Sequence, residues 1–199
     1  MAYGENAFAA MAVPGKPQAS FAAGATYGLG KVFVFGHSEW LTEFAPYSPI
    51  SFKNSLGGEV TQLTIIQSMG TGIPGSPSEA KNQVTYLKNV LIWALGNTYK
   101  NLLGTGGASI SFLTNTSTSF HQDFKLTRNY LPNFFSPINP TTYPLVVLGY
   151  NNLTELDVTN LLEYLKNGGR ILIAVWPNYG KNIEYINKIL KPVGIKYYA

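Results

Sequence analysis

Residues 143–175 read YPLVVLGYNNLTELDVTNLLEYLKNGGRILIAV, and this stretch decides the fold class. Two continuous apolar runs, Tyr143–Leu148 and Arg170–Val175, flank the segment Thr154–Asn167, in which apolar residues recur at helical spacing. A T-x-x-D capping box opens that segment and a Gly-Gly pair ends it, as expected for a helix. Strands without polar alternation, separated by a helix, predict a parallel sheet that is buried on both faces.

The alternation of strands and helices extends to both sides of this stretch. Further strands are predicted at Ser20–Tyr27, Lys31–Phe35 and Ala108–Leu113, and helices at Glu59–Met69, at Ser76 or Ser78 to Leu95, at His121–Leu131 and at Lys181–Leu190. With the apolar run Ala7–Val13, the first 36 residues predict an antiparallel β-meander that joins the sheet. We therefore predict a doubly wound α/β fold with a mostly parallel sheet, in one domain that covers residues 1–199.

The composition excludes several classes of protein. The chain has 199 residues, of which 45% are hydrophobic, 14% aromatic and only 12% charged, so intrinsic disorder is excluded. Because the chain contains no cysteine, disulfides, thiolate catalysis and cysteine-based zinc sites are excluded as well. The charged fraction is about half of the ~25% that is usual for globular domains. Low charge with many aromatics fits a surface that is hidden against partners, so we expect a homo- or hetero-oligomer.

The net charge of +4 lies entirely at the C-terminal end. Residues 1–169 carry nine basic and nine acidic side chains, whereas residues 170–199 carry five basic side chains and one acidic one. The simplest interpretation is a solvated helix face that includes Lys181 and Lys188. Nucleic-acid binding is not favoured, because only two arginines occur and no basic run is interleaved with aromatics. No apolar window is long enough to span a membrane, and no signal peptide is visible, so the compartment stays open.

Ligands of open α/β sheets bind beyond the carboxyl ends of the parallel strands. The loops expected there are rich in hydroxyl, amide and aromatic groups and carry a single charge. The candidate binding residues in these loops are His37, Ser38, Glu39, Trp40, Asn115, Asn151, Trp176, Asn178 and Tyr179. Such a rim suits a neutral polar ligand such as a glycan, a protein surface or a small apolar ligand. It suits a phosphate less well, because these loops carry no basic residue and no Gly-rich cradle, and G-x-x-x-x-G-K-[ST] does not occur.

Catalytic motifs are absent from the sequence. The only histidines are His37 and His121, so H-E-x-x-H is missing and no metal set is predicted, and G-x-S-x-G is missing too. A hydrolase alternative would use His37 as a general base with Glu39 or Ser38. The competing interpretation is that His37 bonds loop backbone and fixes the end of its strand. A carrier of an apolar cofactor or pigment is a third hypothesis, based on the aromatic content alone, and the cofactor is unknown.

Two further features allow simple expectations. Trp93 recurs at helical spacing, which predicts a place in the core. Asn115 and Asn152 head the sequons Asn-Thr-Ser and Asn-Leu-Thr, which matter only in a secreted chain.

The segment Gly24–Leu41, GATYGLGKVFVFGHSEWL, resembles a motif in the N-terminal part of the TRP-channel-associated factor family. The same module accompanies enhancin-like zinc metallopeptidases. Weaker similarity covers most of the chain, at Asn6-Ala7-Phe8, Asn89–Leu95, Tyr143–Tyr179 and Leu190–Tyr197. The resemblance implies a class I glutamine-amidotransferase-like domain with flavodoxin-like layers.

The resemblance also carries implications for function. Amidotransferases of this fold use a cysteine nucleophile, which this chain lacks, and the peptidase of the larger relatives lies in a separate domain. A non-catalytic scaffold or recognition module is therefore implied. Members of the family bind membrane channels or, in microbes, mucin-type glycoproteins. The motif residues here are Gly30, Gly36 and His37, and we expect the glycines to permit tight turns at the two ends of the strand.

Overall fold

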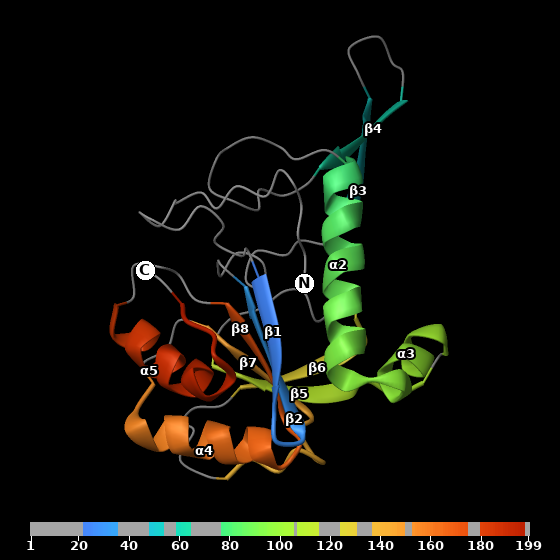
Figure 1. Ribbon diagram of the computed structural model, residues 1–199. Helices are drawn as coiled ribbons and strands as arrows, with labels where there is room; N and C mark the ends of the chain where they lie inside the picture. The colour runs from blue at the N-terminus through green and yellow to red at the C-terminus, as the bar shows by residue number, and fades with distance from the viewer. Residues whose placement is uncertain are drawn as a thin grey trace.

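The computed structural model of the protein describes residues 22–35, 48–53, 59–64, 77–105, 107–115, 124–130, 137–149, 153–174 and 180–197 (Figure 1). The strands are β1 (Ala22–Tyr27), β2 (Gly30–Phe35), β3 (Ser48–Lys53), β4 (Glu59–Thr64), β5 (Ile110–Thr114), β6 (Leu126–Tyr130), β7 (Leu145–Leu148) and β8 (Arg170–Ala174). The helices are α2 (Pro77–Leu95), α3 (Asn97–Gly104), α4 (Glu155–Lys166), α5 (Gly180–Leu190) and the short 3-10 helix η2 (Lys191–Val193).

A mixed sheet of six strands forms the centre of the fold, in the order β1-β2-β8-β7-β5-β6. The hairpin pair β1–β2 is antiparallel, and the four other neighbouring pairs are parallel. This confirms the predicted α/β class with a mostly parallel sheet and an antiparallel extension at its N-terminal side. The run Ala7–Val13 lies outside the described residues, and the single domain over 1–199 stays a prediction.

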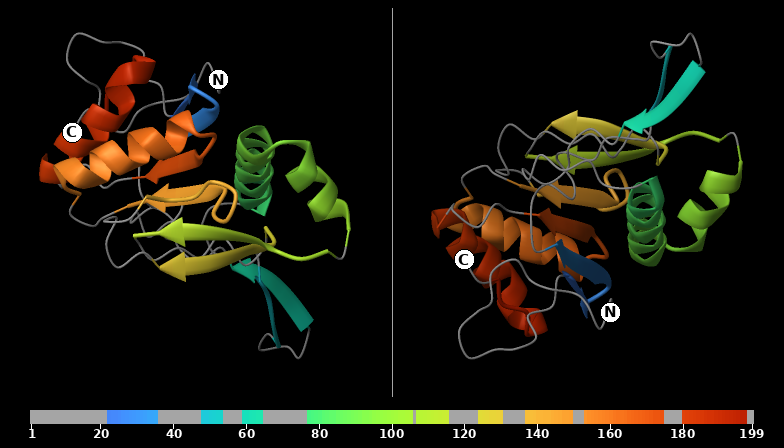
Figure 2. Two further views of the ribbon diagram at one scale, coloured as in Figure 1. Left: turned by 90° about the horizontal axis from the view of Figure 1, so that it is seen from below. Right: turned by 90° about the horizontal axis from the view of Figure 1, so that it is seen from above.

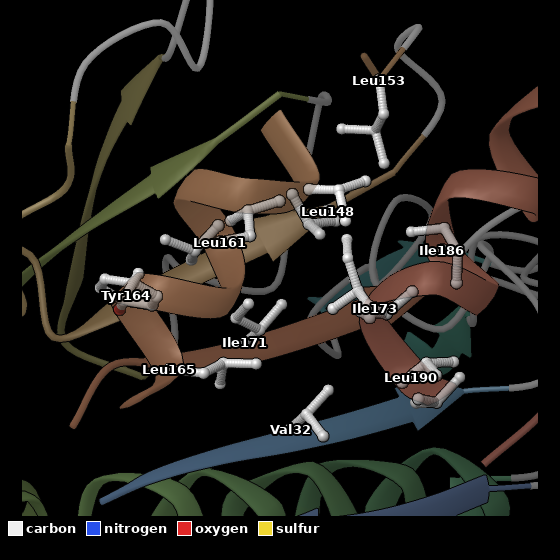
Figure 3. Close-up of a cluster of buried hydrophobic side chains, with 14 of the residues drawn as sticks. Val32, Leu148, Leu153, Leu161, Tyr164, Leu165, Ile171, Ile173, Ile186 and Leu190 are labelled. Carbon is white, nitrogen blue, oxygen red and sulfur yellow. The ribbon is translucent and has the colours of Figure 1, made fainter. Parts of the chain in front are cut away.

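Helices cover both faces of this sheet (Figure 2). Side chains alternate along each strand, so that Ile171 and Ile173 of β8 face α4 and α5, while Leu172 and Ala174 face α2 and α3. Figure 3 shows the first of these two clusters, in which Tyr164 and Leu165 of α4 meet the central strands. All four residues of β7 are buried, which explains why the sequence shows no polar alternation there.

Two predicted helices are strands in the structure. Leu126–Tyr130, inside the predicted helix His121–Leu131, forms the edge strand β6 parallel to β5. Glu59–Thr64, inside the predicted helix Glu59–Met69, is β4, which pairs with β3 in a separate two-stranded ribbon beyond the N-terminal end of α2 (Figure 1). Both segments are rich in Thr, Val or Tyr, which favour strands, and cross-strand pairing outweighs their weak helical periodicity.

Trp93 also differs from its prediction, because its side chain is 37% exposed and does not belong to the core. It lies on the last turns of α2, where its ring packs edge-on against Phe33 with centroids 6.0 Å apart. The ammonium group of Lys31 lies 5.1 Å from the centroid of the Trp93 ring. The helical spacing thus placed Trp93 on the correct side of α2, but at the border of the buried face.

The motif glycine Gly30 is required by a close approach of two backbones. A Cβ atom at Gly30 would lie 2.2 Å from the carbonyl oxygen of Leu165 and 2.5 Å from that of Gly169. The turn between β1 and β2 is also hydrogen-bonded to the end of α4, because Leu29 N–H donates to the Lys166 carbonyl at 3.2 Å. Gly30 is therefore required by its close packing against the end of α4 and not by a tight turn, since the positive φ of 60° at this turn belongs to Gly28. Gly36 lies outside the described residues.

Two basic side chains from adjacent strands cap the C-terminal end of α2 by donating to its last carbonyl groups. Lys31 Nζ of β2 donates to the carbonyl of Trp93 at 2.6 Å, and Arg170 Nε of β8 donates to that of Ala94 at 3.2 Å. Lys31 and Arg170 are direct partners in the parallel pairing of β2 with β8. Since α2 has no basic residue in its own last turn, these strands supply the positive charge that the helix end favours.

The basic C-terminal segment is partly neutralised within the fold. Lys188 on α5 forms ion pairs with Glu155 of α4 and, at 3.2 Å, with Glu184 of its own helix. The hydrogen bond that Lys188 donates to Glu155, followed by the one that it donates to Glu184, raises the pKa of Lys188 above its ordinary value. The side chain of Asn187 holds the end of the chain, because it both donates to the Tyr197 carbonyl and accepts from the Tyr197 N–H.

Candidate functional site

The order of the strands creates a topological switch point between β5 and β7. From β5 the chain continues to β6 on one side, and it then returns to β7 on the other side of β5. In open α/β sheets the carboxyl ends of two such strands flank the crevice in which ligands bind. The residues that follow β5 and β7 in this chain are Asn115 and Gly149.

Asn115 connects these two strand ends and is only 4% exposed. Its Oδ1 accepts a hydrogen bond from Gly149 N–H at 2.8 Å, and its backbone N–H donates to the Val147 carbonyl at 3.4 Å. Because Gly149 N–H needs an acceptor, the carboxamide is held with Oδ1 toward β7 and Nδ2 on the opposite side. That Nδ2 group is buried and has no hydrogen-bond partner.

The first turn of α4 adds a second polar group at the same edge of the sheet. Asp157 Oδ2 accepts from the backbone N–H and from the hydroxyl of Thr154, each at 2.7 Å. Asp157 N–H in turn donates to Thr154 Oγ1 at 3.3 Å, which confirms the capping box that the sequence predicts. The other carboxylate oxygen, Oδ1, has no partner, although Asp157 is only 4% exposed.

Within the described part of the chain, Asn115 Nδ2 and Asp157 Oδ1 are the two buried side-chain nitrogen or oxygen atoms without a partner. Leaving such an atom unsatisfied costs about 1–3 kcal/mol, and more for a charged group. Native structures retain few such atoms, and each one calls for an explanation. Here one is a donor, the other is an acceptor, and both belong to the carboxyl edge where a ligand is expected. We refer to Asn115, Gly149, Thr154 and Asp157 as the carboxyl-edge site.

Two large apolar side chains lie exposed at this edge. Tyr130, the last residue of β6 and the register partner of Thr114, is 58% exposed. The guanidinium group of Arg128 lies 4.7 Å from the centroid of the Tyr130 ring. Leu156, in the first turn of α4, is 48% exposed.

Of the nine predicted binding residues, the structure describes Asn115. The other eight, His37, Ser38, Glu39, Trp40, Asn151, Trp176, Asn178 and Tyr179, lie outside the described residues. The hydrolase hypothesis, which depends on His37 with Glu39 or Ser38, therefore stays a hypothesis. The sequence identified Asp157 only as a helix cap and did not single out Tyr130 at all. Asp157 could have been found from the T-x-x-D spacing. Tyr130 could have been found only from its place at the end of β6, a segment that was predicted to be helical.

The two sequons differ in what the structure describes of them. The Asn115 carboxamide is buried, and its Oδ1 accepts from Gly149 N–H. Asn152 lies outside the described residues.

Other classes of site were sought in the described ranges. Among those residues, no group of three or more His, Cys, Asp or Glu side chains is placed to hold a metal ion. No helix in the same ranges is both long and apolar enough to cross a membrane. Comparison of the chain with protein-family models, curated proteins and solved structures finds no match in any of the three.

Proposed function

We propose that this chain is a non-catalytic recognition or scaffold module that binds its ligand at the carboxyl-edge site. The observation that carries the proposal is Asn115: a buried carboxamide at the β5/β7 switch point, fixed by Gly149, with an unpaired donor. A ligand oxygen at that position would satisfy Nδ2. The absence of cysteine from the sequence supports a role other than amidotransferase or thiol chemistry.

We further propose kinship with the N-terminal module of the TRP-channel-associated factor and enhancin-like families, whose fold is class I glutamine-amidotransferase-like. Support comes from the quoted motif around Gly30 and from the strand order, in which β6-β5-β7-β8 follows the flavodoxin-like 2-1-3-4 arrangement. The hairpin β1–β2 then extends this sheet beyond β8. The proposed ligands of such a module are a protein, a glycan or a small apolar molecule.

The test is an unbiased fragment screen on the ¹⁵N-labelled chain, observed by NMR. We expect binding fragments to shift the backbone amides of Asn115 and Gly149, and to leave those of Leu29 and Gly168 at the opposite end of the sheet unchanged. Asn115→Leu should raise the Kd of those fragments about tenfold or more, because a hydrogen bond to a desolvated group is lost.

The matched control is Asn101→Leu, the same chemical change at an exposed position of α3, which should leave fragment binding unchanged. Fragments that bind elsewhere, or an absence of any fragment that shifts Asn115 and Gly149, would overturn the proposed site.

A further inference from the structure

We propose that Asp157 is the second ligand-binding group of the carboxyl-edge site, and that the ligand is a neutral, hydroxyl-bearing molecule of the sugar class. This inference rests on the proposed function, since it names the ligand chemistry of that site. It starts from the unpaired Oδ1 atom of Asp157, which the capping box does not use.

The two unpaired atoms restrict the chemistry of the ligand. Asn115 Nδ2 needs an acceptor and Asp157 Oδ1 needs a donor. A hydroxyl group supplies both functions, so a molecule with several hydroxyls satisfies both atoms. A carboxylate or phosphate ligand offers no donor to Asp157 and is repelled by its charge. An ammonium ligand would suit Asp157 but offers no acceptor to Asn115. A neutral polyhydroxylated ligand therefore fits better than an anion or a simple cation.

The two groups belong to neighbouring segments of the chain at this edge of the sheet. Leu148, the last residue of β7, and Leu153 belong to the same buried cluster, where both are labelled in Figure 3. The residues that follow them are Gly149, the partner of the Asn115 carboxamide, and Thr154, the partner of the Asp157 carboxylate. Even a fully extended chain could separate Gly149 and Thr154 by no more than about 18 Å.

The rim supplies the apolar contacts that a sugar ring requires. Binding sites combine a few fixed polar groups with aromatic and aliphatic walls. At this edge Leu156, next to Asp157 in the first turn of α4, is exposed. Tyr130 lies four residues after Leu126 in β6 and therefore belongs to the other face of the sheet, which α2 and α3 cover. The C–H face of a sugar can pack on the Leu156 side chain while its hydroxyls bond the buried groups.

The test measures sugar binding to the 199-residue chain by saturation-transfer NMR. The neutral probes are glucose, galactose, N-acetylglucosamine and N-acetylgalactosamine, and the anionic probes are glucuronate and galacturonate, which differ from their parent sugars by one carboxylate. We expect at least one neutral sugar to bind, and the anionic sugars to bind at least about tenfold more weakly, because their carboxylate is repelled by the Asp157 carboxylate.

Two variants test the contact between Asp157 and the ligand. Asp157→Ala should raise the Kd of the neutral sugar about tenfold or more, because a charge-assisted hydrogen bond is lost. Thr159→Ala, at an exposed position of the same helix, removes a hydroxyl that donates to the Glu155 carbonyl and keeps Asp157 with its capping box, so its Kd should stay within about threefold of the wild-type value. Thermal melts of both variants confirm that each is folded at the temperature of the binding measurement.

Each outcome has a distinct meaning. If Asn115→Leu raises the Kd of a sugar but Asp157→Ala does not, the proposed role of Asp157 is wrong while the proposed site stands. If anionic sugars bind as tightly as neutral ones, or no sugar binds at millimolar concentrations, the ligand class is wrong, and the fragment screen still decides the site by itself. If a sugar binds but shifts amides away from Asn115 and Gly149, both proposals fail.

Discussion

The two ends of the parallel sheet differ in how completely their polar groups are paired. At the amino end, Lys31 and Arg170 complete the C-terminal end of α2, and the turn at Leu29 bonds the end of α4. At the carboxyl end, Asn115 and Asp157 each keep one buried polar atom without a partner. Exposure of apolar side chains does not separate the two ends, since Leu29 and Trp93 are exposed at the amino end as Tyr130 and Leu156 are at the other.

The Tyr164 hydroxyl illustrates the pairing at the amino end. The hydroxyl donates to the Tyr143 carbonyl at 2.9 Å and to the Arg170 carbonyl at 3.3 Å, and it accepts from Arg170 N–H at 3.1 Å. Both its donor and its acceptor capacity are therefore used. The polar groups described at the amino end are thus paired within the fold, whereas two buried atoms stay unpaired at the carboxyl end, which is the end where ligands of open α/β folds bind.

The largest effect is expected for Gly30→Ala at the amino end. The new Cβ would meet the backbone oxygens of Leu165 and Gly169 at 2.2 and 2.5 Å, and no side-chain rotation can relieve a clash with backbone. We expect the free energy of unfolding to fall by about 3 kcal/mol or more, measured by urea denaturation. Gly104→Ala is the control, because its Cβ would meet nothing within 4 Å, and it should be neutral or slightly stabilising. Equal effects of the two substitutions would contradict the close approach of the hairpin to α4.

Tyr164→Phe should cost about 2 kcal/mol at neutral pH, because Arg170 N–H loses its acceptor in a buried place. Burial raises the pKa of Tyr164, and also that of Tyr99. The pKa of these buried phenols in the folded protein lies above the value of about 10 in the unfolded chain. Their contribution to the free energy of unfolding is therefore fully present below pH 10, and it is lost as the pH rises through the folded pKa.

Urea denaturation as a function of pH tests both parts of this prediction. The wild-type free energy of unfolding should decline above about pH 10, and the decline should be smaller in Tyr164→Phe, which lacks one of the three phenols whose pKa burial raises, Tyr86, Tyr99 and Tyr164. Tyr185→Phe on α5 is the control, since Tyr185 is only partly buried, and at neutral pH it should lower the free energy of unfolding much less than Tyr164→Phe does. An identical alkaline decline in wild type and Tyr164→Phe would show that this hydroxyl is not desolvated.

A smaller effect is expected when the cations at the end of α2 are removed. Arg170→Met keeps an apolar stem but leaves the Ala94 carbonyl without its donor, so it should destabilise the fold by about 1 kcal/mol. Lys31→Met should cost about half as much, because Lys31 is the more exposed of the two. Lys100→Met on the exposed side of α3 serves as control in the same thermal melts and should change nothing measurable. If Lys100→Met lowered stability as much as Arg170→Met, general charge and not helix capping would be the cause.

The elements that the sequence predicted correctly are those whose local pattern agrees with their final environment. The strands β7 and β8 are buried on both faces, and α4 carries its own capping box, so composition alone identifies them. β6 was missed because its sequence, Leu-Thr-Arg-Asn-Tyr, is mostly polar, which only its place at the edge of the sheet explains. α3 was missed because Gly96 correctly signals the end of α2, and its φ of 82° then lets the chain turn and begin another helix at once.

The candidate site was predictable in position but not in detail. The general rule about strand ends led directly to Asn115, whose place follows from the end of β5. That its Nδ2 is unpaired depends on the pairing of β5 with β7, which brings Gly149 to Oδ1, and no local pattern encodes that contact. Asp157 shows the same limit, because the T-x-x-D spacing explains Oδ2 and leaves Oδ1 to the surrounding fold.

A small effect of undetermined sign on stability is expected at the carboxyl end, for Asn115→Leu. The substitution removes the unpaired Nδ2 donor, which relieves a cost, and it also removes the acceptor of Gly149 N–H, which creates one. These two contributions oppose one another, so the free energy of unfolding should change by no more than about 1 kcal/mol, although the residue is almost fully buried. The measurement is urea denaturation beside Tyr164→Phe, an equally buried polar group whose hydrogen bonds are all made. A loss for Asn115→Leu as large as that for Tyr164→Phe would mean that this carboxamide is built for stability, and the contrast between the two ends of the sheet would then no longer support a binding site at Asn115.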